Sequence, residues 1–253
     1  GGYVHEVDAG LEPWVVVLDF KSMYPSIMIA NNICSTTLLR DGSVDDSYSV
    51  SPITETRYLS KEDRLGLVPQ LLEQLMQSRE VHKAALSAAR ESGDEAEAFL
   101  QDQLQYAVKI LMNSFYGVFA SSFYRFTHPD LGASITEWAR HNIRGIIAHV
   151  EKRGHEVVYS DTDSIFVKAP VDKESPINKP SEDSPIHADW ERAKAETLRF
   201  GESLASEFTK EGAELELETA LSAFFSHGAK KRYVGRVVWP REEMLIRGYE
   251  VRR

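Results

Sequence analysis

The sequence predicts an α+β fold: an antiparallel sheet with helices packed on it, interrupted by an inserted hairpin of two helices. Three observations support this prediction. Residues 14–20, WVVVLDF, form a short apolar run rich in β-branched side chains, as in a buried strand. Residues 67–90 and 95–114 show helical spacing of apolar side chains on either side of a tight break. Short strand-like segments fill most of the chain after residue 214.

The remaining elements follow from local signals. Pro25 favours the start of a short helix at 25–31. The polar stretch 41–63 is rich in turn residues, and Gly154 closes a helix at 130–153. Two short strands, 157–160 and 164–167, flank a turn that carries carboxylates, and a loop at 170–187 leads to a helix at 189–211. The last segments are read as strands over 215–225, 231–239 and 243–251.

Composition is that of an ordinary soluble globular protein. The 253 residues are 42% hydrophobic and 27% charged, without an apolar run of the ~20 residues that a membrane span needs. The first ten residues lack the features of a signal peptide. The single cysteine, Cys34, excludes an internal disulfide, and the eight histidines show no metal-ligand spacing.

Charge is distributed unevenly along the chain. The net charge of −10 taken alone argues against a nucleic-acid partner. Residues 226–253 nevertheless hold eight Lys or Arg against three Glu, whereas residues 169–225 hold thirteen Asp or Glu against six Lys or Arg. A basic segment beside an acidic one fits a localised contact with a polyanion, and ordinary charge scatter is the alternative.

Three aspartates occupy positions that suit a metal. Asp19 lies near the end of the first strand, and Asp161 and Asp163 lie in the turn of YSDTDS. Carboxylates beside apolar strands need a compensating charge, and magnesium takes one or two carboxylates together with phosphate oxygens. Two such ions can promote in-line phosphoryl displacement. The alternative is that Asp161 only satisfies its turn, as aspartate often does.

Polar side chains line the helical hairpin. Arg79 and Lys83 are four residues apart and share a face of the first helix. On the second helix one stripe contains Gln105, Lys109, Asn113 and Tyr116. The hairpin can bring Arg79 and Lys109 together over a triphosphate. A solvated charged face is the alternative, and the aromatic residues that follow Asn113 favour a site.

The segment Lys230, Lys231, Arg232 and Tyr233 is predicted to open a strand. Lys231 and Tyr233 then share one face, which could contact a phosphate backbone without reading its sequence. The alternative is an edge strand protected by charge.

Together these segments resemble family B DNA polymerases along nearly the whole chain and in the family's order. LDFKSMYPSI at 18–27 and YSDTDSIFV at 159–167 resemble the two palm motifs. KILMNSFYG at 109–117 resembles the fingers motif, and KKRYVG at 230–235 the primer-binding motif. FKSMYPSI and FASSFYRF, at 20–27 and 119–126, are most similar to archaeal replicative members.

The resemblance implies template-directed DNA synthesis with two magnesium ions, for which manganese can substitute. Asp19 and Asp163 are the implied metal ligands, completed by the backbone carbonyl of Phe20, with Asp161 as their close partner. The implied incoming-nucleotide site consists of the backbone around Ser22, Met23 and Tyr24, the side chains of Arg79, Lys83 and Lys109, and Asn113 and Tyr116. Tyr24 is the implied steric gate against ribonucleotides. The implied DNA contacts are Thr162, Lys230, Lys231, Arg232 and Tyr233.

The same resemblance implies a palm at 1–60 and 118–253 and fingers at 61–117, with the exonuclease and thumb absent. Gly1-Gly2-Tyr3 resembles the linker between exonuclease and palm, and the chain ends where the thumb would begin. We therefore expect a core with weak grip on DNA and no exonuclease activity. The expected partners are primer–template DNA, dNTPs, the missing domains and a sliding clamp, without a membrane. The expected compartment is the cytoplasm in a prokaryote or the nucleus in a eukaryote.

Two other classes of function remain open. A catalytically silent relative could bind DNA or act as a replisome scaffold. A metal-dependent nuclease could use the same carboxylates, although Arg79, Lys109 and Tyr24 would then have no purpose.

Overall fold

A computed structural model describes residues 9–40, 47–121, 123–124 and 127–249. The chain forms two compact units. Unit 1 consists of Gly1–Lys21 and Arg140–Arg253, and unit 2 consists of Ser22–Ala139. The linker-like segment at 1–3 and the last four residues lie outside the described part. None of the helices in the described part has the length and apolar character of a membrane span.

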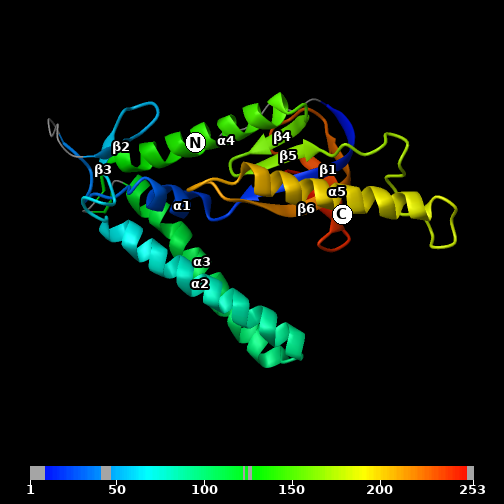
Figure 1. Ribbon diagram of the computed structural model, residues 1–253, viewed down its shortest axis with the longest axis horizontal. Coiled ribbons are helices and arrows are strands. Elements are labelled where there is room, and N and C mark those ends of the chain that lie inside the picture. Colours follow the sequence, from blue (N-terminus) through cyan, green and yellow to red (C-terminus); the bar gives the residue numbers. More distant parts are fainter. Residues whose placement is uncertain (1–8, 41–46, 122, 125–126, 250–253) are drawn as a thin grey trace. The chain divides into compact units, whose positions relative to one another are not determined.

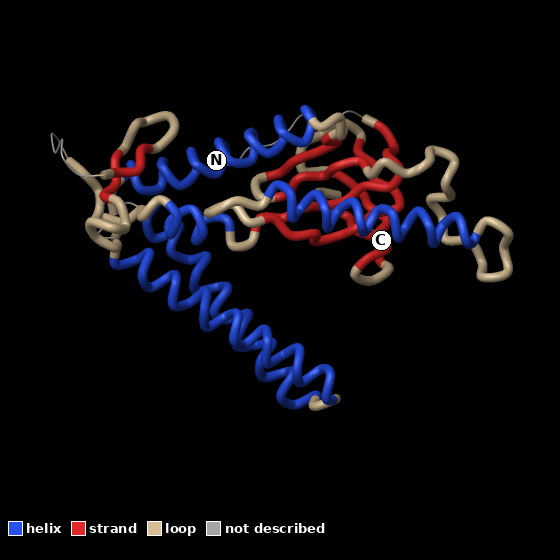
Figure 2. The backbone as a smooth tube through the Cα atoms, viewed as in Figure 1, coloured by secondary structure: helices blue, strands red, loops and turns tan. Residues whose placement is uncertain are grey.

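Unit 1 is built on one six-stranded sheet, drawn in red in Figure 2. Its order is β4-β5-β1-β6-β7-β8, and every neighbouring pair is antiparallel. The strands are β1 (Gly10–Phe20), β4 (Val157–Asp161), β5 (Ser164–Lys168), β6 (Leu215–Ser226), β7 (Tyr233–Trp239) and β8 (Glu243–Arg247). The antiparallel sheet predicted from the sequence is confirmed.

Strand β1 lies inside the sheet, and this position explains its continuous apolar sequence. It pairs with β5 on one side and β6 on the other, and residues 14–18 are buried. Val15 and Val17 belong to a cluster with the aromatic rings of β4, β5 and β6. Val16 faces helix α5 (His187–Phe208), which lies along the sheet in Figure 1. A Cβ atom on Gly201 of α5 would lie 3.0 Å from Val16, so the small residue permits close packing.

Unit 2 contains the predicted helical hairpin. Helix α2 (Leu67–Ser92) ends at Gly93, whose φ of 75° is left-handed, and α3 (Glu95–Ala120) begins after Asp94. The Asp94 carboxylate accepts a hydrogen bond of 3.0 Å from the Glu97 amide and caps α3. A shorter helix, α1 (Met23–Ala30), packs against both α2 and α3. The inserted two-helix hairpin is therefore confirmed.

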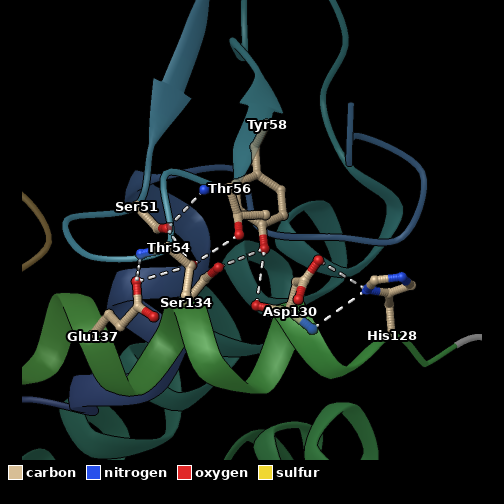
Figure 3. A network of polar contacts seen from close by, with 8 residues as sticks. All are labelled: Ser51, Thr54, Thr56, Tyr58, His128, Asp130, Ser134 and Glu137. Atoms are coloured by element: carbon tan, nitrogen blue, oxygen red, sulfur yellow. Dashed lines mark hydrogen bonds and ion pairs between the residues drawn. The ribbon is translucent and has the colours of Figure 1, made fainter. Parts of the chain in front are cut away.

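A small two-stranded sheet in unit 2 was not predicted. Strands β2 (Tyr48–Val50) and β3 (Arg57–Leu59) lie in the stretch expected to contain turns, and three residues each are too few to show a period. Figure 3 shows how they are held by α4 (Pro129–Lys152), whose residues 129–139 belong to unit 2. Buried Tyr58 donates a hydrogen bond of 2.8 Å to Ser134, and buried Glu137 accepts one of 3.1 Å from the Thr54 amide.

Helix α3 continues six residues beyond its predicted end at Ser114. The motif NSFYG therefore lies within a helix and not at its terminus. Buried side chains continue along the same face, from Met112 to Phe119 two turns later, and this packing outweighs the helix-weakening effect of Gly117.

Candidate functional site

The sheet of unit 1 brings the three aspartates to one corner. Strands β4 and β5 form a hairpin in which Asp161 pairs with Ser164, so Thr162 and Asp163 make the turn. Thr162 has a left-handed φ of 55°, and the Asp163 amide donates to the Asp161 carbonyl at 2.7 Å. The same Ser164 pairs with Asp19 on β1. Register thus places Asp19 beside the turn that carries Asp163.

A backbone hydrogen bond joins the end of β1 to the β4–β5 turn at this corner. The Phe20 amide donates to the Asp163 carbonyl at 3.0 Å. The end of β1 and the β4–β5 turn are therefore held together independently of any carboxylate. Asp19 is half-buried and Asp163 is exposed, so solvent and ligands can reach the turn.

The donor set at this corner suits a divalent cation. Carboxylates and the Phe20 carbonyl offer hard oxygen ligands, as magnesium prefers, and magnesium commonly uses only one or two protein carboxylates with substrate phosphates. Within the described residues, no three His, Cys, Asp or Glu side chains form a complete protein ligand set.

The side chain and the backbone of Lys231 each contact a residue of β4. Its Nζ lies 2.9 Å from Oδ1 of Asp161, and its backbone N–H donates to the Tyr159 hydroxyl at 3.0 Å. Tyr159 and Asp161 are two residues apart on a strand, so their side chains share a face. Thr162 also donates to Oδ1 of Asp161, at 3.0 Å. Burial is the main cause that raises the pKa of Tyr159 to about 12, so its hydroxyl stays protonated at neutral pH.

The prediction that Lys230, Lys231 and Arg232 open a strand is wrong, because β7 begins at Tyr233. These cations lie in the turn before β7, and Lys231 has a left-handed φ of 62° that a strand does not allow. A Cβ atom on Gly248 would lie 2.3 Å from the Lys231 carbonyl oxygen, so this turn needs a glycine opposite it.

The cations and Tyr233 therefore face different surroundings. Lys230, Lys231 and Arg232 are exposed. The ring of Tyr233 instead packs into the aromatic cluster, 5.3 Å from the Tyr159 ring centroid and 5.3 Å from that of Phe166. The turn presents charge to the solvent while Tyr233 anchors the strand behind it.

In unit 2, the start of α1 contacts α3 near the end of the segment KILMNSFYG. The rings of Tyr24 on α1 and Tyr116 on α3 are in contact, with centroids 4.4 Å apart and an interplanar angle of 37°. Ser22, the residue before the helix, has a left-handed φ of 45° and its carbonyl accepts from the Ser26 amide at 2.9 Å. Amide groups in the first turn of a helix point toward its N-terminal end, as those of Met23 and Tyr24 do here.

The predicted cations of the hairpin have distinct surroundings. Arg79 on α2 donates from Nε to Oε1 of Gln105 on α3 at 3.3 Å. Gln105 is one turn before Lys109, so Arg79 contacts the face of α3 that carries Lys109 and Asn113, both of which are exposed. Lys83 instead contacts Glu80 on its own helix at 3.4 Å. The structure thus associates Arg79 with the Lys109 face and gives Lys83 a local partner.

Tyr159 and Gln105 make contacts with candidate site residues that the sequence analysis did not predict. Tyr159 was available as the residue two positions before Asp161 on the same strand face. Gln105 was recognised only as a member of the polar stripe. Its contact with Arg79 depends on how α2 and α3 pack, which residue spacing within one helix does not reveal.

Comparisons with known proteins identify the family. The model of "DNA polymerase family B" matches residues 1–182. DNA polymerase 1 of Pyrococcus abyssi is 32% identical over 99% of this chain, and the DNA polymerase of Archaeoglobus fulgidus is 35% identical over all of it. These alignments cover 29% and 28% of the two relatives, so the chain spans less than a third of their length.

A solved structure agrees with the sequence comparison. The family B DNA polymerase from the hyperthermophilic archaeon Pyrobaculum calidifontis superposes with a TM-score of 0.69 at 26% sequence identity. The match covers 98% of this chain and 29% of that one. With the family model matching well over half of its residues, this chain belongs to DNA polymerase family B.

Proposed function

We propose that this chain carries the polymerising centre of a DNA polymerase, which transfers a deoxynucleotide to a primer 3′-hydroxyl under the direction of a template. The observation that carries the proposal is the corner where Asp19 and the turn bearing Asp163 are held side by side by strand register, in a chain of this family. The proposed palm, residues 1–60 and 118–253, includes all of unit 1, and the proposed fingers, residues 61–117, contain most of the α2–α3 hairpin of unit 2.

Asp19 and Asp163, with the Phe20 carbonyl, are the proposed ligands of two magnesium ions. When bound, the ions supply Lewis acidity to the attacking hydroxyl and compensate negative charge on the pyrophosphate. The bond between O3′ and the α-phosphorus forms, the bond from that phosphorus to pyrophosphate breaks, and the hydroxyl proton passes to solvent. The protein contributes positioning and electrostatics, without a covalent intermediate.

Lys231 is proposed to contact the primer strand near its end, supported by Lys230, Arg232 and Thr162. Its contact with Asp161 leaves other ammonium hydrogens for DNA, since a lysine carries three donors. Asp161 in this proposal orients the lysine and does not bind metal. The anchored turn reduces the conformational freedom that DNA binding would otherwise remove.

Unit 2 is proposed to bind the incoming nucleotide. Arg79 and Lys109 hold the triphosphate, with Lys83 in a lesser part, and the amides at the start of α1 add donors for phosphate oxygens. The ring of Tyr24 occupies the space that a ribose 2′-hydroxyl would need. Tyr116 supports that ring through their 4.4 Å contact, and Asn113 lines the same face of α3.

Primer extension tests the proposal. A labelled primer–template, magnesium and four dNTPs are supplied to this chain, and separately to an archaeal relative in which this chain replaces the matching segment. Extension is expected, and Asp163→Asn should abolish it while circular dichroism stays unchanged. Asp183→Asn is the matched control, because Asp183 is an exposed aspartate of the same unit outside the proposed site.

The same assay separates the competing functions. Salt-dependent duplex binding without extension in either protein would replace the proposal with a silent DNA-binding relative. Magnesium-dependent loss of the labelled DNA without nucleotides would favour a nuclease. Normal extension by the Asp163→Asn variant would remove Asp163 from the metal site.

A further inference from the structure

Two matching polar contacts connect the helices of the fingers hairpin. In the first, Gln105 of α3 accepts a hydrogen bond of 3.3 Å from Nε of Arg79 and donates one of 2.9 Å to Asp102. In the second, one turn toward the hairpin tip, Gln101 contacts Nδ1 of His82 at 2.7 Å and donates to Glu97 at 2.8 Å. All of these side chains except Arg79 and His82 belong to α3.

The carboxylate in each contact fixes the orientation of the glutamine amide. An ionised carboxylate only accepts, so it must face the NH₂ end of the amide. The carbonyl end of Gln105 is then directed across the hairpin as an acceptor. Asp102 therefore determines which atom of Gln105 meets Arg79, and that atom suits a guanidinium donor.

The contact also determines how Arg79 can meet a ligand. A guanidinium has five N–H donors in one plane, and its terminal amino groups can bind a phosphate end-on in a two-pronged arrangement. When Nε is held by Gln105, the motion of the group is restricted and the terminal amino groups keep that capacity. An arginine on an exposed helix otherwise loses much side-chain entropy when it binds.

We propose that Gln105 is a positioning residue for triphosphate binding, which acts by holding Arg79 in the orientation that receives phosphate oxygens. This inference rests on the proposed function, specifically on Arg79 as a triphosphate ligand. Gln105 itself touches the arginine and not the nucleotide.

The neutrality of Gln105 is part of the inference. A carboxylate at this position would pair with Arg79 more strongly, but it would also compete with phosphate for the same cation. It would in addition stand one turn from Asp102, where like charges repel. A neutral acceptor orients the guanidinium and leaves its charge for the ligand. A purely structural contact would instead be strengthened by a carboxylate.

Equilibrium binding tests this without requiring catalysis. The probe is a fluorescent deoxynucleoside triphosphate with magnesium, displaced by inorganic triphosphate. Gln105→Ala should weaken binding up to about tenfold, because the Arg79 side chain is then free before binding and loses its conformational entropy on meeting the ligand. Gln105→Glu should weaken it at least as much, while thermal unfolding shows the hairpin intact. Gln101→Ala is the matched control and should change binding less than about twofold, within the range of indirect effects.

A double variant shows whether Gln105 acts through Arg79. In an Arg79→Ala background, Gln105→Ala should have no further effect on binding. Equal losses from Gln101→Ala and Gln105→Ala, or tighter binding by Gln105→Glu, would overturn the positioning role alone. Wild-type binding by Arg79→Ala, or no binding by the unaltered chain, would overturn the triphosphate assignment of the proposed function and this inference with it.

Discussion

Replacing Lys231 with methionine tests whether the turn at residues 230–232 contacts DNA as proposed, through the salt dependence of affinity. Lys231 is exposed, with 62% of its side chain accessible, and its ammonium lies 2.9 Å from the Asp161 carboxylate. Methionine has a similar length and no charge. Removing the lysine therefore deletes the proposed phosphate contact and leaves Asp161 without its cation. Asp161→Asn in the same assay removes the negative charge beside the lysine and keeps the cation.

The magnitude follows from counterion release. Each phosphate neutralised contributes a slope of about −0.9 to the dependence of log affinity on log salt. Between 50 and 200 mM salt, a fourfold range, one contact changes affinity by about 3.5-fold. The deficit of Lys231→Met relative to the unaltered chain should shrink by that factor as salt rises. Asp161→Asn should bind at least as tightly as the unaltered chain, because losing a negative charge beside the phosphates outweighs losing the contact that orients Lys231.

Fluorescence anisotropy with a labelled primer–template in EDTA measures both effects without metal chemistry. Lys173→Met is the control, since it removes the same charge from an exposed residue within the acidic segment. Repeating Lys231→Met in the Asp161→Asn background isolates the lysine. An unchanged salt slope for Lys231→Met, or equal weakening by Asp161→Asn, would refute the reasoning.

Three further predictions concern the nucleotide site and the two units. Tyr24→Ala should admit ribonucleotides in primer extension, and an unchanged sugar preference would remove Tyr24 as the gate. Tyr58→Phe should lower the free energy of unfolding by about 1 kcal/mol in denaturant titrations, because buried Ser134 loses its partner; no change would mean that water replaces it. The hydrogen bond from Lys168 to Glu12 raises the pKa of that lysine. Its stabilisation is therefore complete below the ordinary lysine pKa and disappears as pH rises through the raised value. Lys168→Met should flatten stability above about pH 10, and an alkaline profile like that of the unaltered protein would contradict this.

The sequence predicted best the elements that carry their own periodic signal. The run at 14–20 and the helices at 67–90 and 95–114 are long or apolar enough for local pattern to decide. The fold class is confirmed for the same reason. The end of α3 was misplaced because Met112 and Phe119 keep the helix together through packing that the sequence does not show.

The same distinction between local pattern and distant contacts applies to the candidate site. The turn bearing Asp161 and Asp163 was predicted between two strands, and the structure has it there. The Lys231 turn was not, since its shape depends on Tyr159, 72 residues earlier, and on the absence of a side chain at Gly248. Contacts between distant segments form only in the assembled sheet. The alternation of side chains along a strand, applied to residues 230–233, therefore predicted the wrong surroundings for Lys231.

The way unit 2 interrupts unit 1 has a consequence for the order in which the protein can form. Helices α2 and α3 are joined through Gly93 and Asp94, so their contacts are local and can develop early in synthesis. Strand β1 instead pairs with β5 and β6, which the ribosome makes more than a hundred residues later. A nascent chain that has reached Ala139 already contains Asp19 but neither Asp161 nor Asp163. Strand β1 therefore lacks both of its native partners throughout that interval, and its apolar side chains are open to non-native contacts.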